Sequence, residues 1–484
     1  MSSRIATSRP RLAQADAERL ARELWDVEGA AAELPSERDQ NFRIRTASGE
    51  SFVLKIAGAS ESDDVLDLQN RALAWLAERD PSLPVPRVVP ARDGGAIARV
   101  PSADGPARVR LLTWLPGTML ADARPRPLAL LASVGSLLGR VDAGLSGFSH
   151  PAARDRDLIW DPERSAAIVR RGLPRVTDSA RAALIEAVLD DHARVVAPLW
   201  ERLPRGVVHN DGNEHNVLVG PPSLAGRAAS GLLDFGDMVE APLVCEPAVA
   251  VAYAVFGHAD PAAAAAAVVA GYDGTRRLED EELEVLWTLA ALRLATSVSI
   301  SAERRRADAS EPYLYVSEAP AWNALARMRE IHTRLAHYRL RGACGRVPCP
   351  RGARMAAWLS GHAAELGPIL DADLSRAEIF DVSVGSPVFE TPADATDTAR
   401  MTERLFGRLR ETGAPAGIGR YDEARLIYAT DAFAGPGGEH PERRTVHLAI
   451  DVFVPPGSPV YAALDGHVYA ARDNAARLDY GPTV

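Results

Sequence analysis

The order of apolar and polar residues predicts a β-rich beginning of the chain. Residues 41–57 (NFRIRTASGESFVLKIA) alternate between the two kinds, which predicts two strands that turn at Ser48-Gly49. Residues 62–79 have helical spacing instead, and one apolar face is formed by Val65, Leu68, Ala72, Leu73 and Leu76. Further strands are predicted, before Pro and Gly interrupt the pattern, at 86–90, 95–100 and 107–115.

The pattern then becomes mostly helical, from about residue 126 to about residue 340. A strand-rich stretch at 206–236 interrupts it, and the alanine run at 260–272 predicts a helix that packs closely against its neighbours. Gly and Pro end the helical pattern after residue 340, and short strands follow from near residue 378. We therefore expect a β-rich lobe, a helical lobe, a linker with a short helix, and a small C-terminal domain, at residues 1–115, 116–340, 341–377 and 378–484.

Composition narrows the classes of function. Acidic residues outnumber basic ones, 65 to 55, and the net charge of −10 argues against general nucleic-acid binding, although it suits a small cationic substrate. No run of about 18 apolar residues occurs, so we predict no membrane-spanning helix and no membrane partner. The N-terminus does not have the pattern of a signal peptide. Three cysteines are too few for a disulfide framework, so we expect a cytoplasmic protein.

Residues 207–220 (VVHNDGNEHNVLVG) combine several side chains that can do chemistry. Asp211 and Asn216 lie five positions apart, so one tight loop can direct both to the same centre. The strand after Asn216 is expected to pair with a second strand that ends at Asp234. With Lys55 on a predicted strand, these residues supply the cation for phosphates, the proton acceptor and the magnesium ligands that phosphoryl transfer from ATP needs.

Two other interpretations of this segment are open. A solvated polar turn has the same residue types without chemistry. A zinc site formed by His209, His215 and Asp211 is less favoured, because no cysteine or second carboxylate accompanies His215 and a neutral imidazole is commonly structural.

The ordered set resembles the aminoglycoside phosphotransferase family, and in particular its hydroxylysine-kinase-like branch, over residues 20–340. The family's His-x-Asp-x-x-x-x-Asn motif is matched by His209, Asp211 and Asn216. The resemblance implies an α+β, two-lobed, protein-kinase-like fold with a β-rich N-lobe and a helical C-lobe. It also implies that ATP and magnesium are the cofactors.

The resemblance also assigns a role to each matched residue. Asp211 is the catalytic base, and His209 braces its loop. Asn216 and Asp234 bind magnesium. The implied nucleotide contacts are Lys55, Ser36, Asn41, Gln69 and Trp114.

Two features depart from protein kinases. The turn that covers the phosphates, residues 36–42, contains no glycine. Gln69 occupies the helix position where protein kinases place a glutamate against the strand lysine. The acid that meets Lys55 is therefore open, and the candidates nearby are Asp63, Asp64 and Asp67.

The acceptor is predicted to be a small molecule. About a dozen residues separate Asp234 from the next apolar helix, whereas protein kinases need an activation segment of roughly twenty or more. Asp237, Glu240 and Glu246 are candidates for a substrate ammonium. Arg293 could hold a carboxylate. Each could instead be a surface or helix-pairing charge.

We therefore expect ATP-dependent phosphorylation of the hydroxyl of a small amine or hydroxy amino acid, similar to hydroxylysine or ethanolamine. An aminoglycoside acceptor is one alternative. The other is a nonenzymatic scaffold, a pseudokinase joined to a degenerate peptidase. The complete set of Lys55, Asp211, Asn216 and Asp234 favours the enzyme.

The C-terminal strands carry a second motif, HLAID, which places His447 four positions before Asp451. With the Pro-Pro-Gly that follows, it resembles the first zinc half of lysostaphin-type metallopeptidases. The His-x-His that completes those sites is absent from the sequence, and two ligands do not make a catalytic zinc site. We expect a small, incomplete all-β domain without tight zinc binding or peptidase activity, and a polar strand end is the alternative. The arrangement is also similar to larger bacterial proteins that continue into a class-III aminotransferase-like domain, which implies truncation at Val484.

Overall fold

The structure is a computed structural model. It describes residues 10–36, 38–58, 61–101, 106–154, 156–224, 226–307, 318–430, 433, 444–475, 478 and 481–484. The chain divides into two compact units, Met1–Cys349 and Pro350–Val484. The first unit contains all the residues predicted to bind ATP, magnesium and the acceptor, and the second contains His447 and Asp451.

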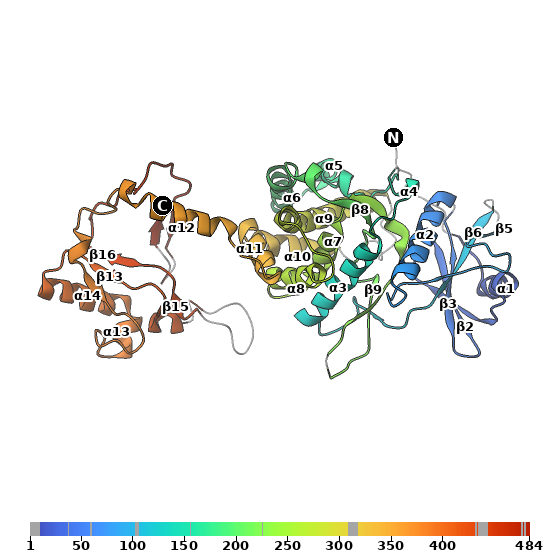
Figure 1. The fold of residues 1–484 in the computed structure, drawn as a ribbon, viewed down its shortest axis with the longest axis horizontal. Helices are drawn as coiled ribbons and strands as arrows, with labels where there is room; N and C mark the ends of the chain where they lie inside the picture. Colours follow the sequence, from blue (N-terminus) through green and yellow to red (C-terminus); the bar gives the residue numbers. More distant parts are fainter. Residues whose placement is uncertain are drawn as a thin grey trace. The chain divides into compact units, whose positions relative to one another are not determined.

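A six-stranded antiparallel sheet forms the N-terminal lobe of the first unit (Figure 1). Its strands follow the order β1-β2-β3-β6-β4, and β5 pairs with β6. The bounds are β1 Gly29–Leu34, β2 Gln40–Thr46, β3 Ser51–Ile56, β4 Val88–Val89, β5 Ala98–Val100 and β6 Ala107–Thr113. The hairpin predicted within 41–57 is confirmed, because β2 pairs antiparallel with β3 and Gly49 at the turn has a φ of 92°.

Strand β1 is missing from the sequence prediction. Its residues, GAAAEL, are rich in alanine and include no β-branched or aromatic residue, so their strand propensity is low. In the structure Gly29 pairs with Thr46. A Cβ atom at Gly29 would lie 2.5 Å from the carbonyl oxygen of Arg45, so the glycine permits this close approach of the two backbones.

The two faces of the sheet have different partners. Helix α1 (Gln14–Trp25) packs its buried residues in one cluster with Leu54 and Ile56 of β3. Because side chains alternate along a strand, Lys55 points to the opposite face. Helix α2 (Asp63–Arg79), which confirms the helix predicted at 62–79, provides part of that face's surroundings.

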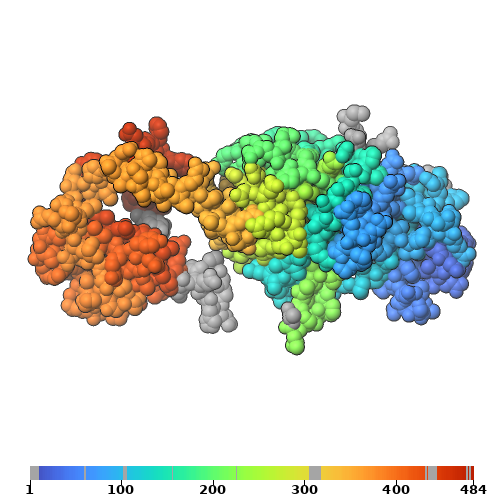
Figure 2. Space-filling model, viewed as in Figure 1, coloured from blue at the N-terminus to red at the C-terminus, as the bar shows by residue number. Residues whose placement is uncertain are grey.

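The second lobe is mostly helical, as predicted, and Figure 2 shows it (green to yellow) packed beside the sheet lobe (blue). Its longer helices are α3 (Leu128–Gly144), α5 (Ser165–Gly172), α6 (Ser179–Asp191), α7 (Cys245–Ala254), α8 (Pro261–Asp273), α9 (Asp280–Ala307), α10 (Glu318–Arg329) and α11 (Thr333–Ala343). Two small sheets, β10-β9-β7 and β11-β8, lie in the same lobe. Their strands are β7 Thr118–Met119, β8 Arg205–Val208, β9 Val217–Val219, β10 Ala229–Leu232 and β11 Val239–Pro242.

The alanine-rich helix α8 packs tightly on α3, as its sequence predicts. A Cβ atom at Gly135 of α3 would lie 1.8 Å from the carbonyl oxygen of Val268, and one at Gly271 of α8 would lie 1.8 Å from that of Ala132. Glycine on both helices therefore sets the distance between their backbones. This contact fixes α3 against α8.

Helix α9 is, among the described residues, the one helix long and apolar enough to cross a membrane by length and composition. Its apolar window is 89% buried inside the first unit. Such burial is typical of the core helix of a soluble protein. The helix carries Arg293 toward the cleft between the lobes.

The second unit contains the predicted short strands. A three-stranded sheet has the order β12-β13-β16, and β14-β15 and β17-β18 form two pairs. The bounds are β12 Glu378–Phe380, β13 Gly417–Gly419, β14 Glu423–Ala424, β15 Val446–His447, β16 Asp451–Phe453, β17 Arg472–Asn474 and β18 Gly481–Thr483. Helix α12 (Pro350–Gly361), where the sequence predicts a short helix, belongs to this unit.

The second unit also contains two helices that the expectation of an all-β domain lacks. These are α13 (Pro392–Thr396) and α14 (Thr398–Thr412). Helix α14 buries Leu405 and Leu409 against Phe380 and Val382. Its apolar residues recur at helical spacing among many charged ones, so an amphipathic helix forms where strands were expected.

Candidate active site

A cavity of about 650 Å³ lies between the sheet lobe and the helical lobe of the first unit. Ten of the predicted site residues line it: Ser36, Asn41, Lys55, Gln69, Trp114, Asp211, Asn216, Asp234, Asp237 and Arg293. The predicted ATP, metal and acceptor residues therefore surround one space. His209 and Glu240 lie outside the cavity lining.

Asp211 lies at the centre of a hydrogen-bonded loop that joins β8 to β9. Asn213 Nδ2 donates to Asp211 Oδ1 at 2.8 Å, and Asn216 Nδ2 donates to Asp211 Oδ2 at 2.6 Å. Burial and the charge of Asp237 raise the pKa of Asp211, while Arg293, with Nη2 3.4 Å from Oδ1, lowers it. A carboxylate held in this way, with raised proton affinity, suits a general base.

The strands β9 and β10 place Asp234 beside Asn216, as the predicted hairpin requires. The backbone N–H of Leu233 donates to the carbonyl of Asn216 at 2.8 Å. Asp234 directly follows Leu233 in the sequence, so this bond brings Asp234 close to Asn216. The side-chain nitrogen of Asn216 is bonded to Asp211. The side-chain oxygen of Asn216, Oδ1, could therefore act as a ligand for a cation. The nearby Lys55 charge holds the pKa of Asp234 below its ordinary value.

The donor set fits a hard divalent cation. Asn216 and Asp234 offer two oxygen ligands, and magnesium usually takes one or two protein carboxylates together with phosphate oxygens and water. Three or more His, Cys, Asp or Glu side chains grouped for a metal are found nowhere in the part of the chain that the structure describes. The site is therefore suited to a cation that arrives with a nucleotide.

His209 is buried and braces the catalytic loop from below. Its Nε2 donates to the carbonyl of Leu233 at 2.9 Å, and its Nδ1 accepts the N–H of Asp211 at 3.2 Å. These contacts define a neutral imidazole with the proton on Nε2. Its ring also meets Phe235 edge-on, with centroids 4.8 Å apart. Both nitrogens are engaged, which leaves none for the alternative zinc site.

The acids that meet Lys55 in the structure are Asp234 and Asp39. The Nζ of Lys55 lies 3.4 Å from Asp234 Oδ1 and 3.6 Å from Asp39 Oδ2, whereas Asp63 bonds Arg99 and Arg108. Sequence reasoning missed Asp39, although the residue lies in the predicted phosphate turn. Gln69 is buried and does not meet the lysine.

The remaining nucleotide-side residues also face the cleft. Asn41 stands opposite Lys55 in the β2–β3 register, and its Oδ1 is buried without a hydrogen-bond partner among the described atoms. Trp114 follows β6 and stacks against the guanidinium of Arg43, with Cζ 4.2 Å from the ring centroid. Ser36 lies in the turn between β1 and β2. A nucleotide would therefore meet donors, acceptors and an aromatic face from the sheet lobe.

The acidic residues after Asp234 differ from one another. Asp237 is buried, and its Oδ1 already has a cation partner in Arg38 Nη2 at 2.5 Å. Glu240 lies on β11, where it pairs with Arg154 at 2.7 Å outside the cavity lining. The structure thus does not bring Glu240 to the acceptor.

Glu246 has a structural position rather than the substrate contact considered from the sequence. It is fully buried on α7, and its Oε2 accepts the backbone N–H of Asn210 at 2.6 Å. Asn210 has a φ of 65°, an uncommon conformation for a residue other than glycine, directly before Asp211. Glu246 therefore holds a strained loop residue in the place that positions the base.

The cavity lining also contains Arg293, Tyr253, Trp160 and Glu214. The Arg293 guanidinium lies over the Trp160 ring, with Cζ 4.2 Å from its centroid. Burial raises the pKa of Tyr253, and the charges of Asp211 and Glu214 raise it further. Glu214, which the sequence prediction missed, has its Oε1 4.0 Å from His215 Nε2, and its Oε2 is buried without a hydrogen-bond partner among the described residues.

In the second unit His447 and Asp451 meet, with Nε2 3.3 Å from Oδ2. However, the Arg425 guanidinium also binds this carboxylate, Nη1 to Oδ2 at 2.5 Å, and the Tyr428 hydroxyl lies 2.7 Å from His447 Nδ1. A metal cation at this pair would be repelled by the arginine charge. The expectation that this pair does not bind zinc tightly stays a prediction, and a metal analysis can test it.

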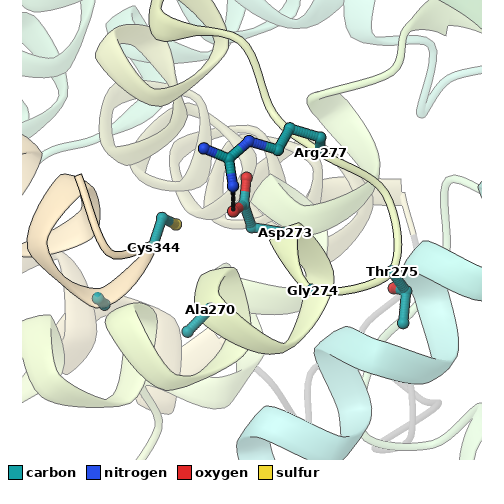
Figure 3. Close-up of a pocket in the computed structure, with 7 residues that line it drawn as sticks. Ala270, Asp273, Gly274, Thr275, Arg277 and Cys344 are labelled. Atoms are coloured by element: carbon teal, nitrogen blue, oxygen red, sulfur yellow. Dashed lines mark ion pairs between the residues drawn. The ribbon is translucent and has the colours of Figure 1, made fainter.

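A second cavity of about 540 Å³, lined by residues of α8 and α11, lacks the same chemistry (Figure 3). Its carboxylate, Asp273, is already paired with Arg346 at 2.9 Å and with Arg277 at 3.5 Å. Burial raises the pKa of the Cys344 thiol to about 11, so this cysteine is a poor nucleophile. The cleft between the lobes is the better candidate for catalysis.

The two lobes and the cleft with Lys55, Asp211, Asn216 and Asp234 define a kinase-like phosphotransferase. A sequence profile of the phosphotransferase enzyme family (APH) matches residues 30–281, more than half of the chain, and the chain belongs to this family. The predicted family and the α+β two-lobed fold are confirmed. The chain is accordingly a small-molecule kinase that uses ATP and a divalent metal ion. The metallopeptidase resemblance of the second unit stays a prediction.

Individual relatives agree with this assignment. The hydroxylysine kinase of Danio rerio is 26% identical over 335 residues, which cover 67% of this chain and 93% of that protein. The homoserine kinase of Gluconacetobacter diazotrophicus is 32% identical over 259 residues, 52% of this chain and 74% of that protein. The solved structure of a microcompartment-associated aminopropanol kinase has a TM-score of 0.50 and 20% identity, covering 69% of this chain and 99% of its own, and supports the fold.

Glu246→Ala should lower both stability and turnover. The change leaves the buried N–H of Asn210 unpaired, which costs about 1–3 kcal/mol. Asp211 directly follows Asn210, so the change should displace the Asp211 carboxylate. The value of kcat should therefore fall about 10- to 100-fold, with a smaller effect on the Michaelis constant for ATP. Denaturant unfolding and steady-state kinetics measure the two effects.

Glu240→Ala is the matched control, because it removes an acid of the same segment outside the cavity. Its partner Arg154 is largely exposed, so stability should change by less than about 1 kcal/mol and turnover should not change. Equal losses in both variants would contradict the role given to Glu246.

Proposed function

We propose that the chain phosphorylates the hydroxyl group of a small hydroxy amino acid, with ATP and magnesium. The observation that carries the proposal is the position of Arg293, a buried guanidinium in the acceptor side of the cavity, 3.4 Å from Asp211. A guanidinium next to the base can bind an acceptor carboxylate bidentately. Two relatives, a hydroxylysine kinase and a homoserine kinase, are named for hydroxy amino acids, which supports this class.

In this proposal each site residue has one role in the reaction. Asp211 accepts the proton of the acceptor hydroxyl as its oxygen bonds to the γ-phosphorus and the bond to the β,γ-bridging oxygen breaks. Lys55 binds phosphate oxygens. Asn216 and Asp234 would hold magnesium, which neutralises charge on the phosphates when bound.

The acceptor ammonium is better matched by Glu214 than by Asp237. The carboxylate of Asp237 is occupied by Arg38, which an ammonium would have to displace. The buried Oε2 of Glu214 has no hydrogen-bond partner among the described residues, and burial raises the pKa of this acid. An ammonium bound beside this carboxylate would offset the cost of burying its charge. Glu214 and Arg293 would thus hold the two charged ends of an amino acid.

The cysteines fit a reducing compartment. No disulfide joins Cys245, Cys344 or Cys349 in the structure. Proteins without disulfides are the rule in the cytoplasm. We therefore place the reaction in the cytoplasm, where ATP is available.

An ATP-consumption screen tests the proposed acceptor class. Hydroxylysine and homoserine should support turnover, whereas ethanolamine, choline and aminoglycosides should support less, because they lack the carboxylate that Arg293 would bind. Aminoglycosides as the sole active acceptors would overturn the proposal in favour of an antibiotic kinase.

Asp211→Asn should retain ATP binding and lose turnover with every active acceptor. The amide keeps the shape of the side chain but cannot take the proton, a role that contributes about 10²–10⁴-fold to the rate. Binding of ATP measured by calorimetry is the control for folding. Turnover within twofold of the parent would remove Asp211 from the role of base.

The metal requirement is the next prediction. Magnesium or manganese should support activity with ATP, whereas zinc should not, because the ligands are an amide and a carboxylate oxygen. Metal analysis of the dialysed full chain should show no stoichiometric zinc, since Arg425 opposes a cation at His447 and Asp451. Full activity in excess EDTA, or retained zinc, would contradict these expectations.

Glu214→Gln should raise the Michaelis constant for the acceptor about 10-fold or more, because a charge-assisted bond contributes about 1.5–3 kcal/mol. The Michaelis constant for ATP should stay within twofold. Asp237→Asn is the matched comparison, and it should act mainly on ATP, because it releases Arg38 of the phosphate turn. The reverse pattern would assign the ammonium to Asp237.

A further inference from the structure

The sheet lobe presents two basic residues side by side to the nucleotide part of the cavity. In the antiparallel register of β3 and β6, Lys55 stands opposite Arg110, so both side chains leave the same face of the sheet. Both line the cavity between the lobes. Arg110 is 2% exposed and is the largest fully buried side chain of the described residues.

Neutral groups alone hold the Arg110 guanidinium by hydrogen bonds. Its Nη2 donates to Gln69 Oε1 at 2.7 Å, and its Nη1 donates to Asn70 Oδ1 at 2.9 Å. Both acceptors are amide oxygens of α2. Among the described residues no carboxylate lies within 4.0 Å of this cation, which makes it different from the buried Arg293.

The nearest acids are already engaged by other cations. Asp39, Asp234 and Glu61 are the carboxylates whose charge acts on Arg110. The first two contact Lys55, and Glu61 lies 3.6 Å from Arg156. Burial lowers the pKa of Arg110, but a guanidinium remains charged in proteins. The charge is therefore buried without a nearby counter-ion.

This arrangement differs from the pair found in protein kinases. There, a helix glutamate binds the strand lysine, so helix and lysine together carry no net charge. Here, Gln69 at that helix position binds Arg110 and contributes no charge. The helix is still tied to the sheet, but a second full positive charge remains beside Lys55.

We propose that Arg110 is a second cation for the nucleotide phosphates, and that Gln69 is neutral in order to leave that charge uncompensated until a nucleotide binds. The proposal rests on the proposed use of ATP but not on the identity of the acceptor. A polyphosphate supplies the missing counter-ion, and a guanidinium fixed by two amides loses little freedom when it binds phosphate oxygens. The same two bonds position α2 against the sheet.

The test compares the binding of ADP and of adenosine to the full chain in the presence of magnesium, by calorimetry and without acceptor. Arg110→Met should weaken ADP about 10- to 100-fold, because a charge-assisted bond is lost, and should leave adenosine within twofold. Arg110→Lys, which keeps the charge but not the planar fork, should lie in between. Equal losses for ADP and adenosine would show a purely structural residue and overturn the proposal.

Gln69→Glu is the decisive variant, because it keeps Arg110 and gives it an acid. A structural role for Arg110 would be unaffected or strengthened by the new ion pair. The proposed role predicts weaker ADP binding, about 10-fold, with a melting temperature that does not fall. Unchanged ADP affinity in this variant would overturn the proposal even if Arg110→Met failed to fold.

Arg108→Gln is the matched control from the same strand. Arg108 also lies on β6, but it binds Asp63 at the start of α2 and is absent from the cavity lining. Its loss should leave ADP binding within twofold. Failure of the parent chain to bind ADP at all would instead contradict the ATP-dependent function, so the two failures are distinguishable.

Discussion

The pairing of β9 with β10 is the contact on which the site depends. Leu233 uses both of its backbone groups: its N–H donates to the carbonyl of Asn216, and its carbonyl accepts Nε2 of His209. Leu233, which directly follows β10, therefore holds the loop around Asp211 at two points. It contacts His209 before Asp211 and Asn216 after it. Because Asp234 follows Leu233, the three residues Asp211, Asn216 and Asp234 cannot move independently of one another. Phosphoryl transfer depends mainly on positioning and electrostatic stabilisation, and in the proposed reaction this hairpin would provide the alignment.

A second constraint is the balance of buried charge across the cleft. Lys55 and Arg38 belong to the sheet lobe, and their partners Asp234 and Asp237 belong to the helical lobe. Both ion pairs therefore cross the cleft and hold the lobes close together. A nucleotide with magnesium would share these same groups, because phosphates attract the cations and the metal attracts Asp234. Arg110 takes part in neither ion pair, because it donates to the amide oxygens of Gln69 and Asn70, and in the proposed role its charge would remain for the phosphates.

The sequence predicted those parts of the site that depend on short spacing. Asp211, Asn216 and Asp234 lie in one hairpin, and strand alternation suffices to place them together. Contacts between residues far apart in the sequence could not be predicted from short spacing or strand alternation. Arg38 meets Asp237 across 199 positions, and nothing in the local pattern of either residue indicates the other. Gln69 lies on the predicted helix, but its partner Arg110 comes from another element, the strand β6, and nothing in the local pattern of either residue indicates the other.

Residue propensities for strand and helix gave a wrong or missing prediction where packing determines the secondary structure. Strand β1 consists mainly of alanine and glycine, and it forms because its neighbour β2 offers a full set of backbone partners. Helix α14 replaced part of an expected β domain for the opposite reason, since its apolar spacing is helical but its many charges conceal the pattern. The same limit applies to Glu240 and Glu246, which look alike in the sequence. One lies against Arg154 outside the cavity, and the other is fully buried under the catalytic loop.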